Sequence, residues 1–195
     1  MSSDTSGERV APIDLDRIKG ISAAKKVKSL TLSDGVPTMT LIDGVKFRSA
    51  RAVSHDKGYL TEVYRADWCL TDFPVVQVNM TTTYPGQTRA WGLHRGVTDR
   101  LFAAAGSLCI AVYDGRVDSP TYGAVNQFFV GSHNQGLVVI APGLWHGWKN
   151  IGAVEATIIS MPSNLYNHAS PDRWELPWNS PEAESLIPYR WPISP

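Results

Sequence analysis

The sequence predicts an all-β fold, a sandwich or a barrel, for most of its 195 residues. Short runs rich in β-branched and aromatic residues recur along the chain, and they are as long as strands rather than helices. Turn residues such as Asp56-Lys57-Gly58 and Asp114-Gly115 separate these runs. The expected strands cover residues 45–53, 59–65, 75–82, 88–94, 100–105, 108–113, 124–130, 137–140 and 155–161.

The two ends of the chain differ from this β-rich middle, so we expect an N-terminal segment at 1–40 and a barrel domain at 41–195. Residues 1–12 read as a tail, and 13–30 as a short, basic helical or irregular segment. Seven of the 13 prolines fall in 162–195, which excludes a long helix or a central strand there. This tail also carries three tryptophans, and we expect their rings to pack on the barrel wall.

The composition argues against several classes of partner. The chain has 18 basic and 18 acidic residues, so it lacks the net positive charge that would attract nucleic acid or an anionic membrane surface. No apolar run approaches the roughly 18 residues of a membrane helix. The polar N-terminus does not read as a secretory signal, and the two cysteines lack metal-type spacing. We expect a reduced, cytoplasmic protein.

The stretch Pro142-Gly143-Leu144-Trp145-His146 follows an apolar run and continues to Asn150. A strand, a Pro-Gly turn and a His between two tryptophans resemble the second half of a cupin motif, in which the turn sends the His into a barrel. The resemblance raises the question of whether this chain binds a metal ion. Metal-loaded cupins usually combine three His with a carboxylate, because first-row metals need several N and O donors at about 2 Å.

The strand at 88–94 offers only His94, with Gly92 at the position where a second ligand would stand. His146 adds a second imidazole, but no nearby carboxylate is evident, so we predict neither a metal nor a cofactor. Proton transfer is the other use of an inward His, whose pKa near neutrality suits a general base. Tyr166 could supply a proton from the opposite side, and Arg100 could stabilise an enolate. The alternative is that His146 is a structural residue and that Tyr166 only anchors the tail.

Several further segments, taken together and in order, resemble the dTDP-4-dehydrorhamnose 3,5-epimerase family of jelly-roll cupins. The resemblance spans about 42–191. The matching segments are 56–62, Val76-Gln77-Val78-Asn79, Tyr84-Pro85-Gly86, Trp91-Gly92-Leu93-His94, 113–116 with 119–123, 142–150 and Ile187-Pro188-Tyr189-Arg190-Trp191.

The resemblance implies a jelly-roll β-barrel in a homodimer that acts on a nucleotide-linked 4-keto sugar without cofactor or metal. It implies His94 as the general base, Tyr166 as the general acid and Arg100 in the place of a family Lys. It also implies that Lys57, Glu62, Gln77 and Asn79 help to hold the substrate. We expect Arg89, Trp91 and His146 to contact the substrate as well.

The chain departs from the family pattern at three places. Trp91 replaces an Arg, with Arg89 two residues earlier, and Ser160 stands in the position of a second Tyr. The Asp that pairs with the family's base lies beyond the final Trp-Pro, and this sequence ends shortly after Trp191. Without a carboxylate to orient it, the base would be weaker. Two acidic residues could take the place of the missing one, Asp99 and Asp114.

These observations predict an epimerase of a nucleotide-linked, dTDP-type 4-keto-6-deoxy sugar, which abstracts and returns protons at C3, C5 or both. One alternative is a non-catalytic sugar-nucleotide or carbohydrate binder that kept the barrel and lost its catalytic pair. Another is a small metal cupin that acts on a substrate other than a sugar.

Overall fold

The computed structural model describes residues 14–26 and 39–193, and the chain divides into two compact units, Met1–Met39 and Thr40–Pro195. In the described part of the first unit, two 3-10 turns, Leu15–Arg17 and Ile21–Ala23, stand where a short helix is expected. The rest of that expected segment, 27–30, and the expected tail, 1–12, lie outside the described residues.

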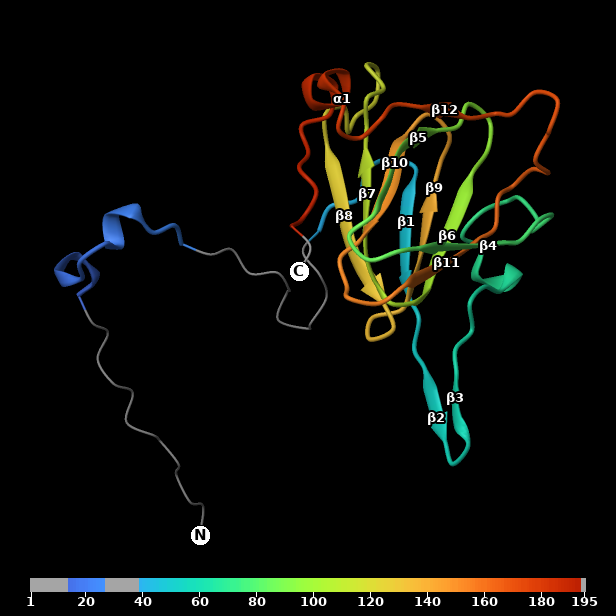
Figure 1. Cartoon of the computed structure of the whole chain (residues 1–195), viewed down its shortest axis with the longest axis horizontal. Helices are drawn as coiled ribbons and strands as arrows, with labels where there is room; N and C mark the ends of the chain where they lie inside the picture. Colours follow the sequence, from blue (N-terminus) through green and yellow to red (C-terminus); the bar gives the residue numbers. More distant parts are fainter. Residues whose placement is uncertain (1–13, 27–38, 194–195) are drawn as a thin grey trace, which may run out of the picture. The chain divides into compact units, whose positions relative to one another are not determined.

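The second unit consists mainly of two five-stranded antiparallel sheets (Figure 1). The first sheet has the order β1 (Val45–Ser49), β9 (Gly136–Ile140), β6 (Asp99–Ala105), β11 (Ala156–Ser160) and β4 (Asn79–Thr83). The second has the order β12 (Trp174–Glu175), β5 (Thr88–Leu93), β10 (Trp145–Asn150), β7 (Ser107–Tyr113) and β8 (Val125–Gly131). The jelly-roll class is confirmed, but the described strands pair as two separate sheets instead of one closed barrel.

The main hydrophobic core lies between the two sheets, and β7 shows how the sequence builds it. Leu108, Ile110 and Val112 alternate along β7 and pack in the core with Val138 of β9 and Ile158 of β11. The intervening side chains of β7 point to the opposite face. They are also buried, because another part of the chain covers that face, and the strand therefore reads as one continuous apolar run.

The Pro-rich C-terminal tail supplies that cover. A short helix, α1 (Pro181–Leu186), is capped at its N-terminus by Ser180, whose side chain accepts a hydrogen bond from the Ala183 N–H. Tyr189 and Trp191 then pack on Trp91 of β5, with ring centroids 5.7 and 5.0 Å from the Trp91 ring. The other two tail tryptophans remain exposed by 40–49%.

A small hairpin of β2 (Val53–His55) and β3 (Gly58–Leu60) extends away from both sheets (Figure 1). The expected strand at 59–65 is therefore shorter, because Val63 and Tyr64 leave the hairpin to pack on the outer face of the first sheet. A 3-10 turn at Ala66–Trp68 follows. No helix among the described residues is long and apolar enough to cross a membrane.

Candidate active site

A cavity of about 610 Å³ opens between the two sheets at one end of the sandwich. Strands β4, β5, β6 and β10 contribute to its walls, and the segment 160–173 closes one side. Six of the site residues expected from the sequence line it. They are Gln77, Asn79, Arg89, His94, His146 and Tyr166.

His94 follows β5 directly, and the Pro-Gly turn expected from the sequence holds it in place. The Gly143 N–H donates a 2.7 Å hydrogen bond to the backbone carbonyl of His94. Gly143 adopts φ 81°, a conformation that favours glycine, and the turn can therefore approach His94 this closely. The turn expected to direct His146 thus also positions His94.

Each ring nitrogen of His94 has a different partner. Nδ1 is hydrogen-bonded to the backbone carbonyl of Asp172, which can only accept, so Nδ1 carries the proton in this contact. Nε2 lies 3.3 Å from Oδ2 of Asp99, and the His94 side chain is 18% exposed. Burial alone lowers the pKa of His94, but the hydrogen bond and charge of Asp99 outweigh burial and raise it.

Asp172 is fastened to the loop that follows His94. Its two carboxylate oxygens accept hydrogen bonds of 2.8 Å from the N–H groups of Arg95 and Gly96. These bonds tie Asp172 to the two residues that follow His94, and they therefore help to hold its carbonyl beside His94 Nδ1. No motif in the sequence singled out Asp172.

His146 approaches the same carboxylate from β10. Its Nε2 lies 3.1 Å from Asp99 Oδ2, and its Nδ1 lies 2.9 Å from the carbonyl of Leu144. Burial would raise the pKa of Asp99, but hydrogen bonds from His146 and His94 hold it well below its usual range. Asp99 thus stays ionised between two imidazoles.

Tyr166 borders the cavity on the segment after β11, with its side chain half exposed. Its backbone N–H donates a 2.9 Å hydrogen bond to Oε1 of Gln77, whose amide nitrogen donates to Oδ1 of Asn79 at 2.8 Å. The two amide side chains expected to face substrate are thereby linked to the segment that carries the candidate acid. Ser160, in the position of the family's second Tyr, also lines the cavity.

Comparison with known proteins identifies the family. The family model described as dTDP-4-dehydrorhamnose 3,5-epimerase matches residues 39–190. The chain belongs to this family. It is therefore an enzyme of the sugar-nucleotide epimerase class.

Two curated relatives resemble this member of the family along most of their own length. Agl13 of Haloferax volcanii, described as a probable low-salt glycan biosynthesis epimerase, is 35% identical over 136 residues, which cover 69% of this chain and 87% of Agl13. SpsL of Bacillus subtilis, a spore coat polysaccharide biosynthesis protein, is 31% identical over 147 residues, which cover 75% of this chain and 94% of SpsL.

Solved structures with the same fold include a dTDP sugar isomerase from Desulfovibrio desulfuricans, with a TM-score of 0.68 and 23% identity over 77% of this chain and 92% of that one. A double mutant of ChmJ, a 3'-monoepimerase from Streptomyces bikiniensis, in complex with dTDP, has a TM-score of 0.69 and 22% identity over 79% of this chain and 77% of that one. At these identities the likeness shows the jelly-roll fold.

Arg100, expected as the enolate-stabilising cation, does not reach the cavity of this epimerase. Asp99 and Arg100 are consecutive in β6, so their side chains point to opposite faces of the sheet. Arg100 is fully buried on the outer face, where Nη1 donates to the Met161 carbonyl at 2.9 Å and Nη2 donates to Thr71 Oγ1 at 2.6 Å. Its guanidinium is a structural anchor for the segment around Thr71.

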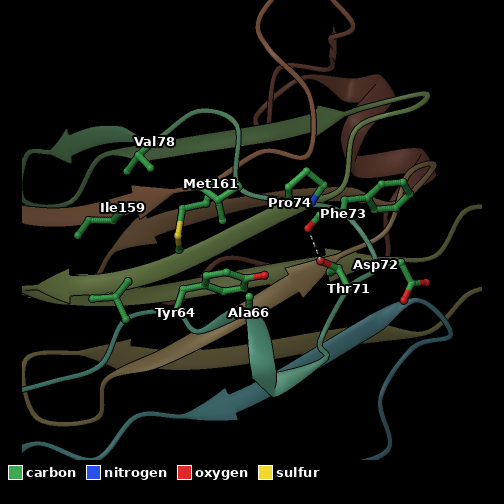
Figure 2. A pocket seen from close by; sticks show the side chains of 11 residues that line it. Tyr64, Ala66, Thr71, Asp72, Phe73, Pro74, Val78, Ile159 and Met161 are labelled. Carbon is green, nitrogen blue, oxygen red and sulfur yellow. Dashed lines mark hydrogen bonds between the residues drawn. The ribbon is translucent and has the colours of Figure 1, made fainter.

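That segment lines a second, apolar cavity of about 810 Å³ on the outer face of the first sheet. Figure 2 shows Tyr64, Phe73, Ile159 and Met161 around it, with the Thr71 hydroxyl hydrogen-bonded to the Phe73 carbonyl at 3.2 Å. This cavity holds none of the site residues expected from the sequence.

Trp91, expected to contact substrate, lies under the C-terminal tail with 2% of its surface exposed. The pairing of β5 with β10 shifts register between His146 and Trp148, and this irregularity breaks the simple alternation of side chains along the strand. Arg89, Gly92 and His94 therefore line the cavity, while Trp91 faces the other side.

Lys57 and Glu62 lie outside the cavity of their own chain. Lys57 is exposed in the turn of the hairpin, and Glu62 forms a 3.0 Å ion pair with Arg65. Asp114, one of the two carboxylates considered for His94, instead binds Arg116 at 2.8 Å in the turn between β7 and β8. Asp99 is the one that meets His94.

Proposed function

We propose that this enzyme epimerises a nucleotide-linked 4-keto-6-deoxy sugar, with dTDP as the nucleotide and with proton exchange at C3, C5 or both. The observation that carries the proposal is the geometry of His94. Its Nδ1–H is held by the Asp172 carbonyl, and its Nε2 lies at the wall of the cavity, 3.3 Å from Oδ2 of Asp99. This is the arrangement that a general base needs.

In the proposed reaction, Nε2 of His94 takes the proton from the carbon beside the ketone. The C–H electron pair moves into an enolate, and the ketone oxygen gains the negative charge. Asp99 stabilises the imidazolium that forms, because its carboxylate lies 3.3 Å from the charged ring. The Asp172 carbonyl holds the ring of His94 in one orientation through its contact with Nδ1.

Tyr166 completes the proposed reaction from the other side of the sugar. Its hydroxyl donates a proton to the opposite face of the same carbon, which forms the new C–H bond and inverts the centre. Arg100 takes no part, because it lies on the far face of the sheet. Polar donors that line the cavity, such as Asn79 and Arg89, remain to stabilise the enolate and the nucleotide phosphates.

We further propose that the protein is a cytoplasmic homodimer. Val53, Tyr59 and Leu60 on the hairpin are about 60% exposed, an apolar surface that a second copy would cover. In such a dimer, Lys57 and Glu62 would serve a substrate bound to the other copy. Light scattering coupled to gel filtration tests this state, and a monomer at micromolar concentration would contradict it.

The experiment that tests the reaction is deuterium exchange. The protein is incubated in D₂O with dTDP-4-keto-6-deoxyglucose, and incorporation at C3 and C5 is followed by NMR. We expect incorporation by the wild type, a loss of at least a hundredfold in His94→Asn, and full activity in His133→Asn, which changes an exposed His outside the cavity.

Two outcomes would contradict the proposal. Unchanged exchange in a folded His94→Asn variant would show that His94 is not the base. Tight binding of the nucleotide sugar with no exchange at either carbon would instead identify a binding protein. Titration calorimetry with dTDP and with the nucleotide sugar measures the binding that the second outcome requires.

A further inference from the structure

We propose that His146 is a positioning residue whose positive charge, acting through Asp99, limits how tightly His94 holds a proton. In the proposed epimerase function, on which this role rests, His94 is the base. Oδ2 of Asp99 lies 3.1 Å from Nε2 of His146 and 3.3 Å from Nε2 of His94. The two rings therefore share one carboxylate oxygen, and the charge on one ring affects proton binding by the other.

Both ring nitrogens of His146 contact groups that only accept hydrogen bonds. Nδ1 lies 2.9 Å from the backbone carbonyl of Leu144, and Nε2 faces the ionised carboxylate of Asp99. Each nitrogen must therefore carry a proton, and an imidazole with two N–H groups is positively charged. Because neither nitrogen has a free lone pair, His146 cannot take a proton from a substrate, and it acts through its charge and its contact with Asp99.

His94 is the ring that loses its proton first. Its Nδ1 also faces a carbonyl, that of Asp172, so the proton that can leave is the one on Nε2. The His94 side chain is 18% exposed and lies 3.3 Å from Asp99, whereas the His146 side chain is 7% exposed and lies 3.1 Å away. Proton loss from His94 therefore breaks the longer of the two contacts, and it occurs at the ring with more access to water.

Two protonated rings in this cluster repel each other. The ring centroids of His94 and His146 are 5.5 Å apart. His146 is buried and His94 is partly buried, so water screens this repulsion only in part. The single carboxylate of Asp99 can neutralise only one of two imidazolium ions. The charge of His146 therefore opposes proton binding by His94.

Other charged groups around His94 come from neighbouring segments. Burial lowers the pKa of His94, and Asp99 and Asp172 raise it. The Asp172 carboxylate also accepts hydrogen bonds from the N–H groups of Arg95, which is exposed, and of the residue after it. His146 is the cation that shares a carboxylate oxygen with His94. The remaining ionisable side chains that line the cavity, in the part of the chain that the structure describes, are Arg89, Tyr166, His168 and Arg173.

This arrangement suits a residue that must both take and release a proton. Asp99 stabilises the imidazolium that forms when His94 takes the substrate proton. The charge of His146 weakens that stabilisation, so a larger fraction of His94 is unprotonated near neutral pH and can act as a base. The hydrogen bond from His146 also holds Oδ2 of Asp99 in the position that faces His94.

The test removes the charge of His146 and keeps a hydrogen-bond donor for Asp99. In His146→Gln, the side-chain amide is neutral and can still donate to the carboxylate. We expect the NMR titration midpoint of the His94 ring, measured on the full chain without substrate, to rise by about one pH unit. The spectrum of His94→Asn assigns the His94 signal. His133→Gln, at an exposed position outside the cavity, is the matched control and should leave the midpoint unchanged.

The pH profile of deuterium exchange gives the second readout. A base works only in its unprotonated form, so the acid limb of His146→Gln should move to higher pH by the same amount. Exchange should therefore fall about tenfold at a pH on the acid limb and change little above it. A merely structural defect would lower exchange at every pH and leave the acid limb in place.

An unchanged or lower His94 midpoint in His146→Gln, shown to be folded by circular dichroism, would overturn the proposal. If the variant does not fold, the nitrogen chemical shifts of the wild type decide. Two protonated nitrogens on His146 at a pH where His94 is neutral support the proposal, and a neutral His146 at that pH rejects it.

Two further outcomes separate this role of His146 from the epimerase function. A raised His94 midpoint with an unmoved acid limb would show that His94 is not the base, and it would contradict the proposed reaction. Deuterium exchange by the wild type, with neither shift in His146→Gln, would reject the role of His146 and leave the epimerase proposal standing.

Discussion

The carboxylate of Asp99 in β6 lies 3.3 Å from Nε2 of His94, which directly follows β5 of the other sheet. Because this contact raises the pKa of His94, its removal should lower that pKa. A base works only in its unprotonated form, so the acid limb of the exchange rate in Asp99→Asn should move to lower pH.

The same substitution should also slow exchange at the pH optimum by about tenfold or more, because the imidazolium loses its counter-charge. The measurement is the pH profile of deuterium exchange, which a purely structural defect would not displace. Asp118→Asn, at an exposed position, should leave the profile unchanged. An unshifted acid limb in folded Asp99→Asn would show that Asp99 does not act through His94.

Tyr166→Phe separates proton removal from proton return. The variant should still incorporate deuterium into the substrate through His94, while the rate of inversion at the sugar carbon falls by about a hundredfold. The ring is half exposed, so the melting temperature should hardly change. NMR of the sugar product distinguishes exchange with retention from inversion. Tyr122→Phe, at an exposed turn, is the control, and equal loss of exchange and inversion in Tyr166→Phe would contradict the assignment.

Arg100→Met should affect stability more than chemistry. The change removes donors to the carbonyls of Met161 and Phe73, which are left without these partners. We expect the free energy of unfolding to fall by about 3 kcal/mol, measured by urea denaturation. Arg51→Met, at an exposed position, should cost little. A stable Arg100→Met variant with a large loss of deuterium exchange would instead indicate a catalytic role for Arg100.

Asp114 should make the protein sensitive to acid. The hydrogen bond from the Arg116 guanidinium, aided by Ser119 and Thr121, outweighs the effect of burial and holds the pKa of Asp114 well below its usual range. A depressed pKa stabilises the fold above the unfolded-state pKa of about 4, and this contribution is lost as the pH falls below that value.

Asp114→Asn should therefore lower the free energy of unfolding near neutral pH by about 2 kcal/mol. It should also flatten the decline of stability below about pH 4, because Asn does not titrate. Melting temperatures between neutral and acid pH measure both effects. Glu155→Gln, at an exposed position, serves as the control. An unchanged acid slope in Asp114→Asn would contradict the assignment.

Most of the strands and part of the site followed from local sequence. Runs of β-branched and aromatic residues, separated by turn residues, predicted β4 to β9 and β11 to within a few residues, because both signals are properties of neighbouring positions. Motif position likewise placed His94 and His146 at the cavity. The geometry of a strand also separates Asp99 from Arg100, since consecutive residues of a strand face opposite sides.

Which of those two faces meets the histidines depends on contacts between residues far apart in the sequence. That choice depends on the packing of β6 against a strand of the other sheet, which no local pattern encodes. The partner of His94 Nδ1 is a backbone carbonyl 78 residues away, and a carbonyl has no sequence signature. Local sequence thus predicts the β-strands and the two histidines, whereas the carboxylate between them, Asp99, is brought there by long-range packing.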